Sequence, residues 1–91
     1  MAAYRLSIKA SAVKELDAIS PKRDRVRIVG RIQSLAANPR PPGYEKLARQ
    51  ERLFRVRQGH YRVIYSVNDA GRTVDIVKIG HRREVYRDST G

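Results

Sequence analysis

Residues 53–67, LFRVRQGHYRVIYSV, decide the fold of this chain because they form the pattern of a β-hairpin. Apolar and polar side chains alternate on both sides of QGH at 58–60, which is the period of a half-buried strand. The simplest pairing of the two strands places four apolar residues on one face of a sheet. These residues are Phe54, Val56, Val63 and Tyr65.

The same pairing gathers arginines on the opposite, uncovered face of the predicted hairpin. They are Arg55, Arg57 and Arg62. A slip of one residue in the register would separate them, because neighbouring side chains of a strand point to opposite faces. The hairpin is therefore expected to supply both a core surface and a cationic surface.

The residues before the hairpin predict one strand and two helices. Residues 4–9, YRLSIK, alternate like a strand, whereas residues 10–19 place apolar side chains at helical spacing, with Ser11 as a candidate cap. Ser20 and Pro21 suit the N-cap and first position of a second helix, which reaches residue 37 with one apolar stripe. The two helices are expected to form a hairpin that covers one sheet face.

The remaining segments predict loops and one more strand. Residues 38–43, NPRPPG, cannot continue a helix. Residues 44–51 have no clear period, although Leu47 is expected to lie beneath the sheet edge. After a turn at residues 68–71, NDAG, the β-branched segment 73–79 predicts the last strand. The expectation is a single α+β domain over residues 1–91, in the order β-α-α-β-β-β, with an antiparallel-type sheet.

Charge is the strongest feature of the composition. Twenty Lys and Arg against nine Asp and Glu give a formal net charge of +11 in 91 residues, which attracts polyanions. There is no cysteine, and two histidines are too few for a zinc site, so no metal or cofactor is expected. Neither a signal peptide nor an apolar run of the ~20 residues that span a bilayer is present. A cytoplasmic protein without a membrane role is expected.

One reaction suits this inventory of residues, namely cleavage of RNA by its own 2′-hydroxyl. Arginines held on strands can stabilise the charge that develops on the phosphorus in the transition state. Arg62 and Arg82 are candidate clamps, Tyr86 can stack on a base or supply a proton, and His81 is a candidate general acid. Each also has a structural alternative, since strand arginines are commonly solvated or salt-bridged.

Other residues are interpreted as structural. His60 next to the turn is expected to be exposed, and Tyr61 and Tyr65 are expected in the core. The arginines of the second predicted helix are interpreted as a solvated face. They are Arg23, Arg25, Arg27 and Arg31.

The second half of the chain resembles the RelE/ParE superfamily of toxins from toxin–antitoxin pairs. The resemblance rests on FRVRQGHYRVIYSV, NDAG, TVDIVKIGHR and REVYR, and the order of elements extends it over nearly the whole chain. It is closest to the RelE branch, whose members are metal-independent mRNA interferases that cut messenger RNA in the ribosomal A site. By motif, the resemblance implies that Arg62 and Arg82 bind phosphate and that Tyr86 stacks on the base.

The match departs from that branch at Arg55 and Arg57, which stand where the best-studied enzymes carry two lysines. Arginine, with a pKa above about 12, is a poor general base. The two residues are therefore interpreted as electrostatic groups, and Glu45 is a candidate base because some relatives place a glutamate ahead of this strand. The resemblance also implies an antitoxin partner. Two alternatives remain, a ParE-like toxin that inhibits gyrase without nuclease activity and a catalytically weak RNA-binding relative.

Overall fold

The computed structural model of the chain describes residues 3–47 and 50–81. Its elements follow the predicted α+β order, with one strand more than expected, since β2 forms within the segment 44–51 that showed no clear period. None of the described helices is long and apolar enough to cross a membrane. The elements are β1 Arg5–Ile8, α1 Ala10–Asp17, α2 Lys22–Ala37, β2 Glu45–Leu47, β3 Gln50–Gln58, β4 Tyr61–Asn68 and β5 Thr73–His81.

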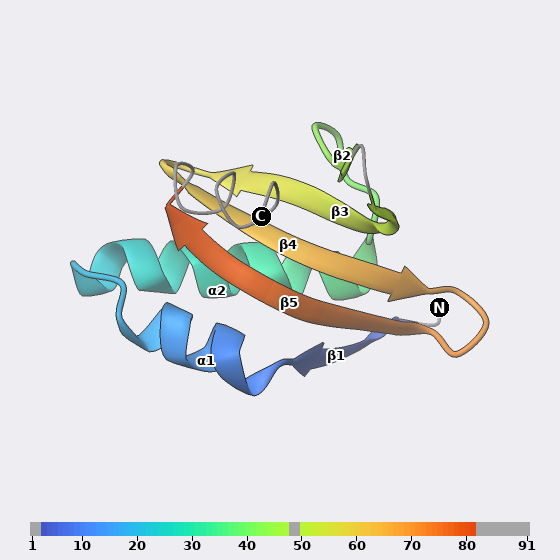
Figure 1. The fold of residues 1–91 in the computed structure, drawn as a ribbon, viewed down its shortest axis with the longest axis horizontal. Helices are drawn as coiled ribbons and strands as arrows, with labels where there is room; N and C mark the ends of the chain where they lie inside the picture. The colour runs from blue at the N-terminus through green and yellow to red at the C-terminus, as the bar shows by residue number, and fades with distance from the viewer. Residues whose placement is uncertain (1–2, 48–49, 82–91) are drawn as a thin grey trace.

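The five strands form one sheet in the order β1-β5-β4-β3-β2 (Figure 1). From β2 to β5 all neighbours are antiparallel, as expected. β1 instead runs parallel to β5, with Arg5 opposite Thr73 and Ile8 opposite Ile76. The sheet is therefore mixed, because a strand separated from its neighbour by most of the chain is free of the antiparallel pairing that a hairpin imposes.

Both helices lie on the same side of the sheet (Figure 1), as the sequence predicted. The core between the helices and the sheet contains the four apolar hairpin residues expected there, and Tyr65 and Val63 are completely buried. The apolar stripes of α1 and α2 fill the other side of this core. The buried helix residues are Ala12, Ile28, Ile32 and Leu35.

The helices begin without the side-chain caps that the sequence predicted. α1 follows Lys9, so Ser11 lies inside its first turn and makes no capping bond. Pro21, not Ser20, occupies the N-cap position of α2, with φ −71° and no side-chain cap hydrogen bond. The proline ring fixes φ near this value and removes one backbone donor, which suits it to the start of a helix.

The β3–β4 hairpin has the predicted register. Phe54 lies opposite Tyr65 and Val56 lies opposite Val63. Gly59 in the connecting turn has φ +61°, a conformation that side chains with a Cβ rarely adopt. The turn residues and the alternation of the strands therefore specify the same pairing.

α1 is bonded to the free edge of β5. Pairing with β1 ends at Ile76, so the strand beyond it exposes backbone donors. Ile79 donates its backbone N–H to Oε1 of Glu15 at 3.0 Å, and Nζ of Lys78 donates to Oε2 of the same carboxylate at 2.6 Å. One glutamate thus protects this edge from pairing with another strand and positions α1.

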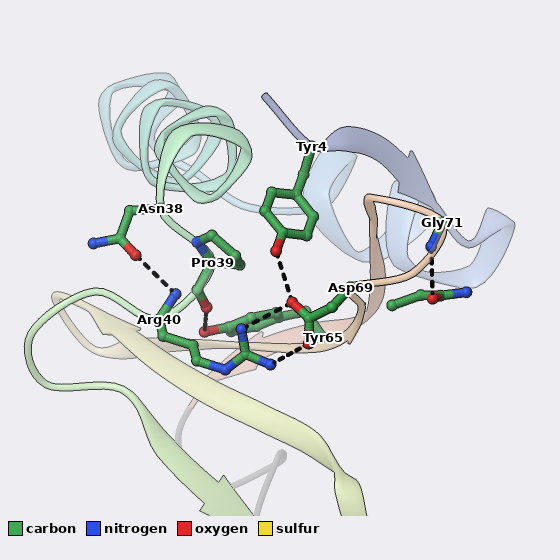
Figure 2. Close-up of polar contacts among 8 residues, drawn as sticks. Tyr4, Asn38, Pro39, Arg40, Tyr65, Asp69 and Gly71 are labelled. Atoms are coloured by element: carbon green, nitrogen blue, oxygen red, sulfur yellow. Dashed lines mark hydrogen bonds and ion pairs between the residues drawn. The ribbon is translucent and has the colours of Figure 1, made fainter. Parts of the chain in front are cut away.

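Polar side chains pair with one another where the β4–β5 turn meets the start of the chain (Figure 2). Asp69 accepts a hydrogen bond from the Tyr4 hydroxyl at 2.6 Å and bonds from both Nη atoms of Arg40 at 3.1 and 2.9 Å. The bonds from Arg40 and then Tyr4 lower the pKa of Asp69 to about 2. Conversely, the bond to Asp69 raises the pKa of Tyr4.

The same region contains a buried hydrogen bond. The hydroxyl of Tyr65 donates to the carbonyl oxygen of Pro39 at 2.7 Å, and burial raises the pKa of Tyr65 to about 12 (Figure 2). The guanidinium of Arg40 lies 5.5 Å from the centre of the Phe54 ring, within the range of a cation–π contact. We name the set of Tyr4, Pro39, Arg40, Tyr65 and Asp69 the closed end of the sheet.

Candidate nucleic-acid interface

The uncovered side of the hairpin carries the three arginines that the sequence grouped. Arg57 lies directly opposite Arg62, and Arg55 lies opposite Ile64 on the same face. We name the sheet face with Arg55, Arg57 and Arg62 the arginine face. Like charges directly across a strand pair are destabilising. This arrangement therefore favours an anion between the two opposed guanidinium groups.

Arg62 is buried, in contrast to the uncovered position expected for it. The residue is 6% exposed, and Nη1 donates to the backbone carbonyl of Tyr61 at 3.2 Å. Its other neighbour across the sheet is Gly80, which has no side chain. Arg57 is exposed. Arg62 is thus held in place, whereas Arg57 reaches into solvent.

Neither opposed arginine forms an ion pair with a described carboxylate. A buried guanidinium without a counter-ion is costly, because burial removes hydration that no opposite charge replaces. A buried arginine that forms no ion pair with a described carboxylate is typical of an anion-binding site.

Glu45 joins the arginine face through the register of β2. It lies directly opposite Arg55, and its Oε1 accepts a hydrogen bond from Nη2 of Arg55 at 3.0 Å. The glutamate side chain is 63% exposed, whereas that of Arg55 is 14% exposed. The carboxylate is therefore accessible to a ligand and is held in position by Arg55, and reach is what a candidate base needs first.

The structure does not bring His81 to the arginine face. Strand β5 continues to His81, which lies opposite Tyr61, while Gly80 lies opposite Arg62. Because side chains alternate along a strand, His81 points to the other side of the sheet from Arg62. There its ring stacks against that of His60, with centroids 6.2 Å apart, and meets the edge of Tyr61 at 5.9 Å.

Four of the seven candidate residues therefore share one face, namely Arg55, Arg57, Arg62 and Glu45. Arg82 and Tyr86 lie outside the described residues. In the part of the chain that the structure describes, no three His, Asp or Glu side chains are grouped as metal ligands would be.

The structure adds a pocket that the sequence did not indicate. It lies between the first turns of α2 and the β3–β4 turn, with a volume of about 230 Å³. Its lining residues are Asp24, Arg27, Gln58, Gly59, His60 and Tyr61. The sequence correctly predicted that His60 is exposed, but the helix and the turn are distant along the chain and no local pattern links them.

The chain matches a family model described as ParE toxin of type II toxin-antitoxin system, parDE, over residues 6–86. It is also similar to the curated protein Toxin RelE of Mycobacterium tuberculosis. The two are 30% identical over 84 residues, which cover 92% of this chain and 87% of that protein.

Two solved toxin–antitoxin complexes contain chains with a similar fold. In the RelBE2 complex from Mycobacterium tuberculosis, the matched chain gives a TM-score of 0.77 at 27% identity, covering 88% of this chain and 99% of that one. In the archaeal RelE–RelB complex from Pyrococcus horikoshii, the TM-score is 0.77 at 34% identity, with coverage of 88% and 96%.

Proposed function

Since this chain belongs to the ParE toxin family of type II toxin–antitoxin systems, within the RelE/ParE superfamily, we propose that it is a toxin that cleaves messenger RNA. The observation that carries the proposal is the arginine face. Arg57 lies directly opposite a buried Arg62, and neither forms an ion pair with a described carboxylate. A phosphate of the RNA backbone is the anion that such a pair suits best.

The proposed reaction uses the 2′-hydroxyl of the RNA as the nucleophile. The 2′-oxygen loses its proton and attacks the adjacent phosphorus, while the bond from phosphorus to the 5′-oxygen breaks. The products are a 2′,3′-cyclic phosphate and a 5′-hydroxyl that has gained a proton. Arg62 and Arg57 stabilise the additional negative charge on the phosphoryl oxygens in the transition state.

The remaining roles are assigned by position and by the family resemblance. Glu45 accepts the proton of the 2′-hydroxyl, since its exposed carboxylate is on the arginine face and is oriented by Arg55. Tyr86 stacks on the base and supplies the proton of the leaving oxygen, and Arg82 binds the same phosphate. His81 is not assigned as the acid, because the register directs it to the other face.

We further propose a cognate antitoxin as the protein partner and mRNA in the ribosomal A site as the substrate. The similar chains from Mycobacterium tuberculosis and Pyrococcus horikoshii were solved in toxin–antitoxin complexes. A net charge of +11 favours an acidic antitoxin segment that covers the arginine face.

The test is inducible expression followed by mapping of transcript 5′ ends by primer extension. We expect growth arrest with in-frame cuts inside translated codons. Arg62→Ala is expected to lower cleavage by about 10²–10³-fold, the usual effect of removing one donor to a developing oxyanion. Arg62→Lys keeps the charge but not the bidentate geometry and is expected to retain only part of the activity. Glu45→Gln tests the proposed base.

Arg5→Ala is the matched control, since it removes one exposed arginine from β1 at the opposite edge of the sheet. It is expected to cleave like the wild type. Circular dichroism must show that each variant is folded. The family match also supports an alternative function, that of a ParE-like gyrase inhibitor. Growth arrest with intact transcripts and a DNA-damage response would favour that function and overturn the nuclease.

A further inference from the structure

The pocket beside the β3–β4 turn is built from charged and aromatic side chains. Asp24 and Arg27, one helical turn apart on α2, form one side, and Gln58, His60 and Tyr61 form the other. The positive φ of Gly59 turns the chain sharply enough to place Gln58 and Tyr61 next to each other. The site is therefore assembled from two elements that only the tertiary fold brings together.

The polar side-chain groups of this pocket have no hydrogen-bond or ion-pair partners among the described residues. The side chains of Asp24, Arg27, Gln58, His60 and Tyr61 make no hydrogen bond or ion pair with any described residue. Asp24 is an anionic acceptor, Arg27 is a planar cationic donor, and the amide of Gln58 both donates and accepts. These groups are exposed or half-buried and therefore hydrated, so a ligand with complementary donors and acceptors can replace the water in the hollow.

The aromatic rings of His60 and Tyr61 line the same hollow, and both contact His81, which is not among the lining residues. His60 and His81 stack with their planes 19° apart, and Tyr61 meets His81 edge to face at 79°. A volume of about 230 Å³ is smaller than the roughly 300–1,000 Å³ of common small-molecule pockets. Stacking surfaces and a small volume favour one planar ring system with polar edges.

We propose that this pocket binds a single guanine base of an RNA strand. The guanidinium of Arg27 matches the O6 and N7 acceptors of guanine, and the carboxylate of Asp24 matches its N1–H and N2–H₂ donors. The imidazole of His60 provides a stacking surface. No other RNA base offers two acceptors on one edge and two adjacent donors on the next.

The position of the pocket links it to the arginine face. Gln58 follows Arg57 and Tyr61 precedes Arg62, and the Cα atoms of consecutive residues are about 3.8 Å apart. Because α2 and the pocket lie on the other side of the sheet from the arginine face, an RNA strand whose phosphate contacts the two opposed arginines must pass around the end of the hairpin to place a base in the pocket. The inference rests on the proposed function for the identity of its ligand as RNA, and it adds a preference for guanine near the cleaved bond.

The test measures binding without cleavage. Fluorescence anisotropy compares a 2′-O-methyl oligouridine with an oligonucleotide of the same length that contains one guanine. Equal length cancels the phosphate contribution, which is strong for so basic a protein. We expect the full chain to bind the guanine-containing strand about tenfold more tightly. Arg27→Ala and Asp24→Asn are expected to abolish this preference.

Arg23→Ala is the matched control, because it removes an equal charge from the same helix outside the pocket. It is expected to weaken binding of both strands equally and to keep the preference. Arg27→Lys, which retains the charge, is expected to lose most of the preference and covers the case that Arg27→Ala does not fold. Arg62→Ala is expected to lose cleavage while keeping the preference, so the two proposals fail separately.

Three results would overturn the inference. The first is equal affinity of the wild type for the two strands. The second is a stronger preference for adenine or cytosine at the same position. The third is competition by free guanosine monophosphate as effective as that by the guanine-containing strand, which would assign the pocket to a mononucleotide.

Discussion

The same kinds of polar side chain lie near the two ends of β4, but they are hydrogen-bonded to one another at one end only. At the closed end, Tyr4, Arg40 and Asp69 bond to one another through three hydrogen bonds. At the other end, Tyr61, Arg27 and Asp24 line a pocket and make no side-chain bond to a described residue. A tyrosine, an arginine and an aspartate therefore form a structural network in one place and a candidate binding site in the other.

The difference shows what identifies a functional polar cluster. Residue types alone do not separate the two ends, whereas the pairing of their donors and acceptors does. A satisfied network stabilises the fold, whereas polar side chains without protein partners around a hollow are hydrated and can exchange that water for a ligand. Substitutions at the closed end should therefore change stability, and substitutions at the pocket should change binding.

The largest effect on stability is expected at the buried hydrogen bond of the closed end. Tyr65→Phe removes the donor to the Pro39 carbonyl in a fully buried position and should cost about 1–2 kcal/mol in the free energy of unfolding. Urea denaturation measures the loss. Tyr44→Phe is the control, because Tyr44 is half-buried and its hydroxyl has no partner among the described residues. Equal losses in the two variants would contradict the assignment.

A smaller loss is expected for Arg40→Ala. The variant removes a bidentate pair with Asp69 and the contact with the Phe54 ring, but the Arg40 side chain is 39% exposed and the pair is screened by water. We expect about 1 kcal/mol, with part of it already lost in the wild type at high salt. Thermal unfolding at two salt concentrations is the measurement. A loss that salt does not change would assign the effect to packing alone.

The closed end should also make stability depend on acid pH. Asp69 has a folded pKa of about 2, below its ordinary 3.8, so its ionised form stabilises the fold above about pH 4. This contribution is lost as the pH falls towards 2. Asp69→Asn should therefore have a lower Tm than the wild type near neutral pH, with the difference shrinking between about pH 4 and pH 2. A constant difference across that range would show that ionisation of Asp69 is irrelevant.

The smallest effect on stability is expected at the pocket. Arg27→Ala should change the free energy of unfolding by no more than about 0.5 kcal/mol, as should Arg23→Ala, because both side chains are exposed and neither is paired with a described residue. Chemical denaturation of both variants tests this directly. A clear loss for Arg27→Ala alone would mean that the pocket stabilises the fold and would remove the contrast between the two ends.

Much of the fold could be predicted because its signals are local. The alternation in residues 53–67 and the turn at Gly59 specify the hairpin register, and with it the grouping of Arg55, Arg57 and Arg62. β2 had no such signal, since three residues cannot show a period and the strand is defined by its pairing with β3. The parallel pairing of β1 with β5 joins the two ends of the described chain and leaves no local pattern.

Only the parts of the candidate site that follow from the alternation of side chains along a strand could be predicted from the sequence. The side of the sheet on which His81 lies depends on β5 continuing past Ile79, which composition alone did not show. Burial of Arg62 is likewise a property of its surroundings. The pocket needs α2 to pack with its first turns against the hairpin turn, more than thirty residues away along the chain.

By itself, the sequence determined the α+β order of elements, the hairpin and its arginine face, and the family resemblance, because periodicity, turn residues and motifs act over short distances. Only the tertiary structure decided which polar groups are satisfied. Asp69 is paired because the start of the chain and the loop after α2 reach it, whereas Asp24 lines a pocket between α2 and the hairpin turn and has no side-chain partner among the described residues. Hydrogen bonds between distant segments depend on how the helices pack on the sheet, and no local pattern specifies that packing.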